Sequence, residues 1–202
     1  STKKIIANIS LFYMQRDNQQ VQISSQQDPG DPNSFYYFTA NAGAGYNYGL
    51  ELDSKIKLST SLTLNGTLGL LQTHVDEYTF DSGIEEIILG GREQAMAPKY
   101  NFSMGIDYNH FGGIFANLDI SGKDSYYYDE SHNQTLNASL ISNGELGFKK
   151  NRWSVSLWLK NITGIHAAHA FYFALEPPDY VTKEYIQVSD PFHFGVTTSY
   201  QF

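Results

Sequence analysis

The sequence predicts an all-β chain whose antiparallel strands, about eight in number, form part of a transmembrane β-barrel wall. Three observations support this fold class. Apolar and polar residues alternate with a period of two in eight segments, the connections between them alternate between short and long, and no segment keeps a helical period. None of the 202 residues lie in an apolar stretch of about 18 residues, but strands that span a bilayer hide their hydrophobicity in alternation.

The first four segments place apolar or aromatic side chains on one face and mostly polar side chains on the other. In the first segment, Ile5, Ile9 and Tyr13 alternate with polar residues such as Asn8 and Ser10. A period of two is the side-chain repeat of a β-strand. The pattern therefore predicts strands over residues 5–13, 46–58, 62–70 and 100–108.

The last four segments show the same alternation and end on an aromatic carboxy-terminus. The closing segment keeps apolar, aromatic or threonine side chains on one face, namely Phe192, Phe194, Val196, Thr198, Tyr200 and Phe202. One such segment also fits the edge strand of a soluble sheet, so the prediction depends on the whole series. The series predicts strands over residues 114–120, 136–148, 153–159 and 192–202.

The connections alternate in length as regularly as the faces alternate in polarity. Short turns are expected near residues 59–60, 109–112 and 149–151, and long connections over residues 16–45, 74–98, 123–134 and 161–190. Short turns on one side and long loops on the other are typical of an outer-membrane barrel with its short turns in the periplasm. An even number of strands then places both termini on the short-turn side.

The composition excludes several classes of protein. The chain has no cysteine, which excludes disulfides, a thiol nucleophile and a thiolate metal site. The net charge of −8 argues against a nucleic-acid partner, because such proteins carry a basic face. Charged residues make up only 17% of the chain, below the roughly 25% of soluble domains.

Aromatic residues bound the apolar faces, and this distinguishes a membrane wall from a soluble sheet. Tyrosine and tryptophan favour the bilayer–water interface because it satisfies both the apolar ring and the polar tip. We expect a membrane aromatic girdle made of Tyr46, Tyr48, Tyr100, Tyr108, Trp153 and Tyr200. The polar faces, with Glu51, Asp53 and Lys55 among their residues, then face a wet lumen, and the strands need partners because lipid tolerates no unpaired sheet edge.

Four stretches, in order along the chain, resemble the C-terminal part of the barrel of TonB-dependent outer-membrane receptors. The first two are Asn41-Ala42-Gly43 with Tyr48-Gly49-Leu50-Glu51-Leu52, and Met96-Ala97-Pro98-Lys99-Tyr100. The third is Asn143-Gly144-Glu145-Leu146-Gly147-Phe148, followed by Trp153-Ser154-Val155 and Lys160-Asn161-Ile162-Thr163-Gly164. The fourth is Ser189-Asp190-Pro191, leading to Gly195-Val196 and Phe202. Phe192 stands where the family usually has an arginine, which leaves the strand prediction intact.

The resemblance implies that residues 1–202 are the C-terminal segment of a 22-stranded barrel, without its plug domain and N-terminal strands. The start at Ser1 fits an excised or processed piece. The implied function is uptake of a scarce nutrient, most of all a ferric siderophore, across the bacterial outer membrane. The implied partners are outer-membrane lipid, the rest of the barrel and plug, the TonB complex through the absent plug, and the ligand. The family also implies a barrel-assembly signal at Phe194, Gly195, Tyr200 and Phe202.

Clusters of aromatic residues in the long loops are candidate ligand contacts, because rings can stack on the arms of a siderophore. With one cation for an anionic ferric complex, the candidates are Tyr36, Tyr37, Phe38, Arg92, Tyr126, Tyr127, Tyr128, Phe171 and Tyr172. The alternative for each cluster is loop packing or upper-girdle anchoring, and for the arginine a solvated charge. His166 and His169 are spaced for a shared metal, but no third ligand accompanies them, so we predict no metal site and no cofactor.

No catalytic motif is present, so we predict that the chain is not an enzyme. Two other functions remain open alternatives. The first is a self-contained eight-stranded outer-membrane barrel with a structural or adhesion role, in which residues 5–13 would pair with residues 192–202. The second is a soluble β-sandwich binding module. A catalytic site assembled across barrel strands is a further alternative for which no residue gives specific support.

Overall fold

The structure, a computed structural model, describes the backbone of residues 4–26, 28, 31, 34–41, 43–81, 86–130, 132–173 and 183–202. The side chains of residues 21–26, 35–38, 40, 80–81, 87 and 172–173 lie outside the description. These described segments form strands, turns and irregular connections. Within them no helix is long and apolar enough to span a membrane.

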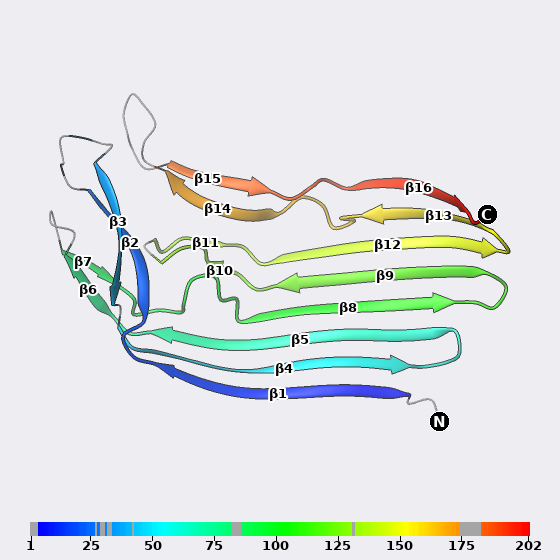
Figure 1. The fold of residues 1–202 in the computed structure, drawn as a ribbon, viewed down its shortest axis with the longest axis horizontal. Coiled ribbons are helices and arrows are strands. Elements are labelled where there is room, and N and C mark those ends of the chain that lie inside the picture. The colour runs from blue at the N-terminus through cyan, green and yellow to red at the C-terminus, as the bar shows by residue number, and fades with distance from the viewer. Residues whose placement is uncertain are drawn as a thin grey trace.

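Eight long strands form one antiparallel sheet in which each strand pairs with the next one along the wall (Figure 1). Their order is β1 (Ile5–Arg16), β4 (Gly45–Lys57), β5 (Leu62–Val75), β8 (Tyr100–Asn109), β9 (Ile114–Lys123), β12 (Ser139–Lys150), β13 (Trp153–Lys160) and β16 (His193–Tyr200). The all-β antiparallel fold predicted from the sequence is confirmed. Each predicted wall segment lies on one of these strands, with differences only at the ends.

The sheet is open, since β1 and β16 form its two edges and the described residues contain no pairing between them (Figure 1). The N-terminal end of β1 and the C-terminal end of β16 both lie at the end with the short turns, as the strand parity predicts. We call this the short-turn end and the opposite one the loop end. An eight-stranded barrel closed by β1 and β16 is therefore not the arrangement observed.

The register joins the apolar side chains of neighbouring strands into continuous rows on one face, which we call the apolar face. One row crosses all eight strands through Ile5, Ile56, Leu64, Ile106, Leu118, Gly144, Leu159 and Phe194. A register slip of one residue would turn every such side chain to the other face. The alternation in the sequence therefore fixes the pairing of the whole wall.

The opposite side, the polar face, carries rows of hydroxyl, amide and charged side chains. One of its rows runs through Lys57, Thr63, Asp107, Asn117, Glu145, Trp158 and Gly195. Neighbouring side chains bond across strands: Asn65 Nδ2 donates to Asp107 Oδ2 at 3.0 Å, and the Thr67 and Ser103 hydroxyls lie 2.8 Å apart. Such bonds hold the polar side chains in place along the wall.

Aromatic rings on the wall lie over glycines of the neighbouring strand. A Cβ atom at Gly49, Gly147 or Gly195 would lie within 2.6 Å of the facing ring, which belongs to Phe12, Phe115 and Trp158 respectively. In each case ring and glycine are opposite each other in the register. These pairs pack a large ring over the bare backbone and so help to fix the register locally.

Each long connection contains a two-stranded ribbon at the loop end, which the sequence does not predict. The ribbons pair β2 (Gln20–Gln26) with β3 (Phe35–Asn41), β6 (Tyr78–Asp81) with β7 (Glu86–Leu89), β10 (Tyr126–Tyr127) with β11 (Thr135–Leu136), and β14 (Ala167–Phe173) with β15 (Lys183–Val188). One prediction is wrong here: the sixth wall strand begins at Ser139, and Leu136 belongs to a loop ribbon.

The sheet exposes more surface than a folded domain of its mass. Its accessible surface is 13447 Å², whereas a compact monomer of 22.8 kDa would expose about 9,600 Å². The buried hydrophobic residues in the described part lie at the loop end and are few: Val75, Ala95, Tyr128, Leu136 and Ala170. The wall is a single layer whose two faces are available to partners, which is not the two-layer packing of a β-sandwich.

Candidate functional site

The candidate site lies at the loop end, where the loop segments pack on one another above the wall. Backbone bonds join segments that are distant in the sequence. Met96 N donates to Tyr127 O at 2.7 Å, and Val75 N donates to the carbonyl of Arg92 at 2.9 Å. These bonds hold the segment before β8 between the end of β5 and the β10–β11 ribbon.

Tyr128 is the centre of the small core at this end, with only 2% of its surface exposed. Its ring packs with Leu136 and Ala170, and the partly buried Tyr126 and Ala167 pack against this cluster. The Tyr128 hydroxyl donates to Glu184 Oε1 at 2.9 Å. The cluster therefore joins the β10–β11 ribbon to the β14–β15 ribbon, which is the loop packing that the sequence leaves open for this residue.

Arg92 connects the second long loop to the third. Its Nη2 atom donates to the carbonyls of Asp129 and Glu130, both at 2.9 Å, and its guanidinium carbon lies 4.1 Å from the centre of the Tyr127 ring. Its Nη1 atom is buried and has no hydrogen-bond partner. A planar guanidinium stacked on a ring and bonded to two carbonyls is well suited to join two loops.

Burial perturbs two acidic groups beside this arginine. The pKa of Glu130 is raised, chiefly by burial, although the Arg92 charge acts in the opposite direction. Burial also raises the pKa of the Tyr78 hydroxyl, and the Glu130 carboxylate adds to this effect. The junction between the two loops therefore favours uncharged forms of its acidic groups.

Two cavities that are both lined by Lys123 form the strongest candidate for ligand contact. One, of about 450 Å³, is lined by Asn101, Phe102, Ser121, Gly122, Lys123, Ser139, Ile141, His166 and Ala168. The other, of about 280 Å³, is lined by Met96, Pro98, Lys123, Tyr126, Tyr128 and His169. The Lys123 ammonium donates to the Tyr126 hydroxyl at 2.9 Å and lies 4.6 Å from the centre of that ring.

Lys123 was not among the residues that the sequence singled out, although a signal for it exists. It is the last residue of β9, and it lies opposite Ser139 and Asn101 in the register. Continuing the alternation of the fifth predicted strand beyond Ile120 assigns Ser121 and Lys123 to the polar face. A cation at the upper end of a polar strand face is therefore visible in the sequence.

The two histidines of the fourth long loop do not converge on one point. His166 lines the larger cavity and His169 the smaller one. His166 Nδ1 is buried without a hydrogen-bond partner, while the His166 backbone exchanges bonds with Ser189. In the part of the chain that the structure describes, no group of three His, Asp or Glu side chains is arranged to hold a metal ion.

The remaining aromatic candidates fall into two groups. Phe171 lies in β14, is 47% exposed, and stacks on Tyr185 with the ring centres 5.4 Å apart. The backbones of Tyr36, Tyr37 and Phe38 belong to β3 and that of Tyr172 to β14, but the side chains of these four lie outside the described residues. Their role as ligand contacts stays a prediction.

The predicted girdle residues lie in two bands on the apolar face. Tyr46, Tyr48 and Tyr100 lie toward the loop end, with the Tyr46 and Tyr48 ring centres 6.1 Å apart. Tyr108, Trp153 and Tyr200 lie toward the short-turn end, where the ring centres of Trp153 and Tyr200 are 4.9 Å apart. The predicted barrel-assembly residues Phe194, Gly195, Tyr200 and Phe202 all lie on or just after the edge strand β16.

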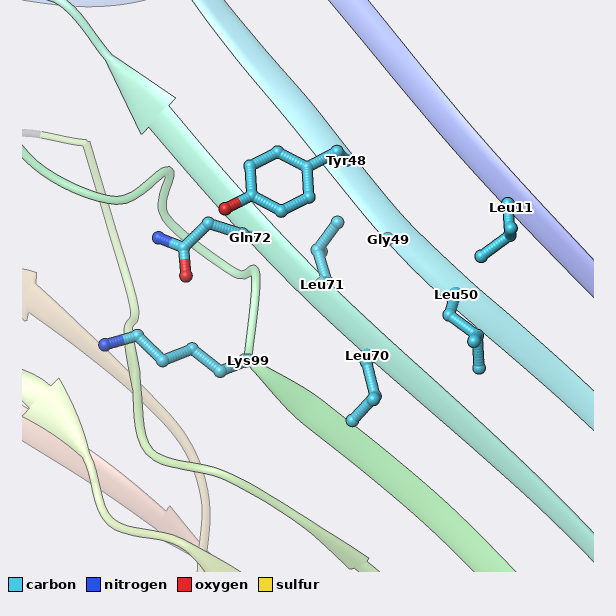
Figure 2. A pocket seen from close by; sticks show the side chains of 8 residues that line it. All are labelled: Leu11, Tyr48, Gly49, Leu50, Leu70, Leu71, Gln72 and Lys99. Carbon is cyan, nitrogen blue, oxygen red and sulfur yellow. The ribbon is translucent and has the colours of Figure 1, made fainter.

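An open hollow of about 430 Å³ lies on the wall near the aromatic band of the loop end. It is lined by Leu11, Tyr48, Gly49, Leu50, Leu70, Leu71, Gln72 and Lys99. Figure 2 shows the polar ends of Tyr48, Gln72 and Lys99 together at one end, away from Leu11 and Leu50. Lys99 pairs with Glu93 at 2.9 Å, which raises the pKa of the ammonium and lowers that of the carboxyl. Leu11, Leu50 and Leu70 belong to the apolar face, and the hollow shares no lining residue with the cavities around Lys123, so the two sites are separate.

Comparisons with known proteins agree with this architecture. A family model described as "TonB dependent receptor-like, beta-barrel" matches residues 2–162. The ferric yersiniabactin uptake receptor FyuA from Yersinia pestis is similar with a TM-score of 0.71 and 14% identity, over 100% of this chain and 28% of that one. The ferric-catecholate import receptor Fiu from K12 E. coli gives 0.67 and 14%, over 100% and 26% of the two chains. The copper transporter OprC gives 0.65 and 11%, over 100% and 30%.

These likenesses establish the fold alone. Sequence identities of 14% or less carry no information on the ligand. The chain spans between 26% and 30% of the length of these three proteins. The family model covers well over half of the chain, and its description names the architecture that the alternation predicts. The chain belongs to the TonB-dependent receptor-like β-barrel family.

Proposed function

We propose that this chain forms part of the barrel wall and several ligand-capturing loops of an outer-membrane receptor for a scarce nutrient, most of all a ferric siderophore. The observation that carries the proposal is the open eight-stranded sheet with one continuous apolar face and one polar face. A wall of this kind needs lipid on one side, water or protein on the other, and further strands at both edges. The family match supports all three.

In this proposal the apolar face lies against lipid and the polar face lines the lumen. The short turns lie in the periplasm and the loop ribbons outside the cell. The edges β1 and β16 continue into further strands of the same receptor. Residues 1–202 are then its C-terminal segment, and a plug fills the lumen and receives the pull of the TonB complex. The chain itself is a structural and binding part and has no catalytic role.

The cavities around Lys123 support an anionic, aromatic ligand. A cation bonded to a tyrosine hydroxyl, with further rings at the cavity wall, suits a complex that carries negative charge on aromatic groups. Two of the similar structures are a ferric yersiniabactin uptake receptor and a ferric-catecholate import receptor. Another is a copper transporter, so the copper ion is included in the test below.

The test is binding by the full-length receptor that contains this chain, measured as quenching of its tryptophan fluorescence. The probes are ferric enterobactin, ferric yersiniabactin and copper(II) chloride. We expect one ferric complex to bind and the variant Lys123→Gln to weaken its binding by at least about tenfold, because a hydrogen bond to a charged group contributes about 1.5–3 kcal/mol. Lys160→Gln, a change of the same kind at an exposed position of β13, is the matched control. Binding of none of the ferric complexes would contradict the siderophore proposal.

The two alternatives from the sequence gain no support. A closed eight-stranded barrel requires β1 to pair with β16, and these strands are opposite edges of the sheet. A soluble sandwich requires a second sheet over the apolar face. No second layer covers that face in the described part of the chain, where Leu11 is 77% exposed and Val196 68%.

A further inference from the structure

The short-turn end of the wall carries a cluster of cations that the proposed receptor function does not use. Three of the thirteen Lys and Arg residues of the chain lie where β12 turns into β13: Lys149 and Lys150 are the last residues of β12, and Arg152 lies in the turn itself. We call residues 149–152 the basic turn. All three side chains are exposed, and none of them has a carboxylate within ion-pair distance among the residues that the structure describes.

The surrounding charge makes this cluster stand out on a chain of net charge −8. The sequence has no Asp or Glu in residues 54–75, 108–118 or 146–175, the three stretches that contain the short turns. Asp107 is the acidic residue closest to the neighbouring turn, and it lies on the polar face, where Asn65 binds it. Lys4, Lys55 and Lys57 lie toward the same end at the β1–β4 side, and all three are exposed. The short-turn end is therefore a basic rim on an otherwise acidic protein.

Exposed aromatic side chains stand beside the basic turn. Lys150 is opposite Trp153 in the register, on the side of the apolar face, and Trp153 is 59% exposed. The neighbouring turn presents Phe111, which is 95% exposed. The two turns are in contact, because Lys149 N donates to Gly113 O at 2.8 Å. Tyr200 packs on Trp153 and carries the row on to Phe202.

A cation beside exposed rings at the edge of an apolar surface is the pattern of interfacial anchoring. Rings settle at the level of the headgroups, and long cationic side chains extend from the apolar surface to reach charged groups there. Basic side chains near an anionic membrane surface are attracted within about a Debye length, close to 10 Å at 0.1 M salt. The exposed basic turn, whose cations make no ion pair within the described residues, meets these conditions.

We infer that the basic turn is a binding site for the headgroups of anionic phospholipids in the leaflet that the short-turn end reaches. Lys150 contacts the headgroup phosphate beside Trp153, and Lys149 and Arg152 add attraction from the turn. The inference rests on the proposed membrane function. It adds that the wall selects anionic over zwitterionic lipid at this end.

The test uses Trp153 as a reporter in the full-length protein, reconstituted in phosphatidylcholine vesicles. Part of the lipid is replaced by brominated phosphatidylglycerol or by brominated phosphatidylcholine, and the Trp153 signal is the difference from Trp153→Phe. We expect the anionic lipid to quench this signal at a mole fraction at least fivefold lower, which is the effect of about one cation near an anionic surface. High salt should reduce the preference.

Two triple variants distinguish charge from shape. Changing Lys149, Lys150 and Arg152 to glutamine should abolish the preference, whereas Lys149→Arg, Lys150→Arg and Arg152→Lys together should retain it. Equal quenching by the two lipids in the unchanged protein, or a preference that survives in the glutamine variant, would overturn the inference. Equal quenching would instead favour an acidic protein partner for the turn. If neither lipid quenches Trp153, the proposed membrane location itself fails.

Discussion

The assignment of the two faces predicts opposite outcomes for a lysine placed at two adjacent positions, Leu68 and Thr67. Leu68 lies on the apolar face between Leu52 and Phe102, and Thr67 lies on the polar face beside Ser103. Leu68 is six residues from Leu62, which faces Tyr108 in the lower aromatic band, and four from Gln72, which faces Tyr48 in the upper band. With a rise of about 3.3 Å per residue, it is about 20 Å and about 13 Å along the strand from these two levels. The position is therefore close to the middle of the wall.

A lysine on the lipid face of a barrel strand costs about 2–4 kcal/mol at the bilayer midplane and little near the interfaces. Leu68→Lys should therefore lower the free energy of unfolding by about 2–4 kcal/mol. Thr67→Lys, which enters a wet polar face and loses one exposed hydrogen bond to Ser103, should lower it by no more than about 1 kcal/mol. The assay is urea unfolding of the full-length receptor in lipid vesicles, followed by tryptophan fluorescence. An equal or larger loss for Thr67→Lys would refute the assignment of the faces.

Three further predictions concern the loop end and a short turn. Tyr128→Phe removes the hydrogen bond to Glu184 and should lower the local opening free energy of β14–β15 by about 1 kcal/mol, read from amide hydrogen exchange, because the exposed carboxylate regains water. Because burial raises the pKa of Glu130, the packed loop binds a proton more readily than the open loop. Its opening free energy should therefore rise as the pH falls through this pKa and level off below the ordinary glutamate pKa, and Glu130→Gln should remove that rise. Gly113→Ala should destabilise the wall by about 1–3 kcal/mol in urea unfolding, since φ is +98° and a Cβ would lie 2.2 Å from Lys149 O, whereas Gly112→Ala should cost less.

The wall was predictable from the sequence because one physical constraint repeats along it. A sheet with lipid on one side must place an apolar residue at every second position, so Ile5, Ile9 and their equivalents mark both the strands and their register. The alternation of short and long connections then predicted the loop plan and the placement of both termini at the same end. The aromatic–glycine pairs, such as Trp158 over Gly195, could not be read, since they depend on which residues face each other across strands.

The loop end was less predictable because its packing is neither periodic nor local. Leu136 continues the alternation of the following strand, so the period placed it on the wall, yet it packs in the core around Tyr128. The β10 strand contains only two residues, which is too few for any period. Arg92 reaches Asp129 and Glu130 from more than thirty residues away, and a sequence pattern holds no information on such a contact.

Part of the candidate site could be identified from the sequence pattern, and part of it could not. The sequence placed Tyr126 in a ligand-contacting loop, and the structure places it at a cavity beside Lys123. Lys123 itself could have been found by extending the strand alternation by three residues. The burial of Tyr128 and the contacts of Arg92 favour loop packing for these two, which was the alternative left open for each.

In the proposed receptor, β8 and its neighbours form a wall with lipid on one side and water on the other. Spin labels placed one at a time at residues 100–109 of the full-length receptor in vesicles measure this directly. We expect high accessibility to oxygen at Tyr100, Phe102, Met104, Ile106 and Tyr108, and high accessibility to a water-soluble nickel complex at Asn101, Ser103, Asp107 and Asn109. The opposite alternation, with oxygen reaching the odd-numbered positions and the nickel complex the even-numbered ones, would contradict this assignment of the faces. Accessibility to the nickel complex at every position would contradict it as well.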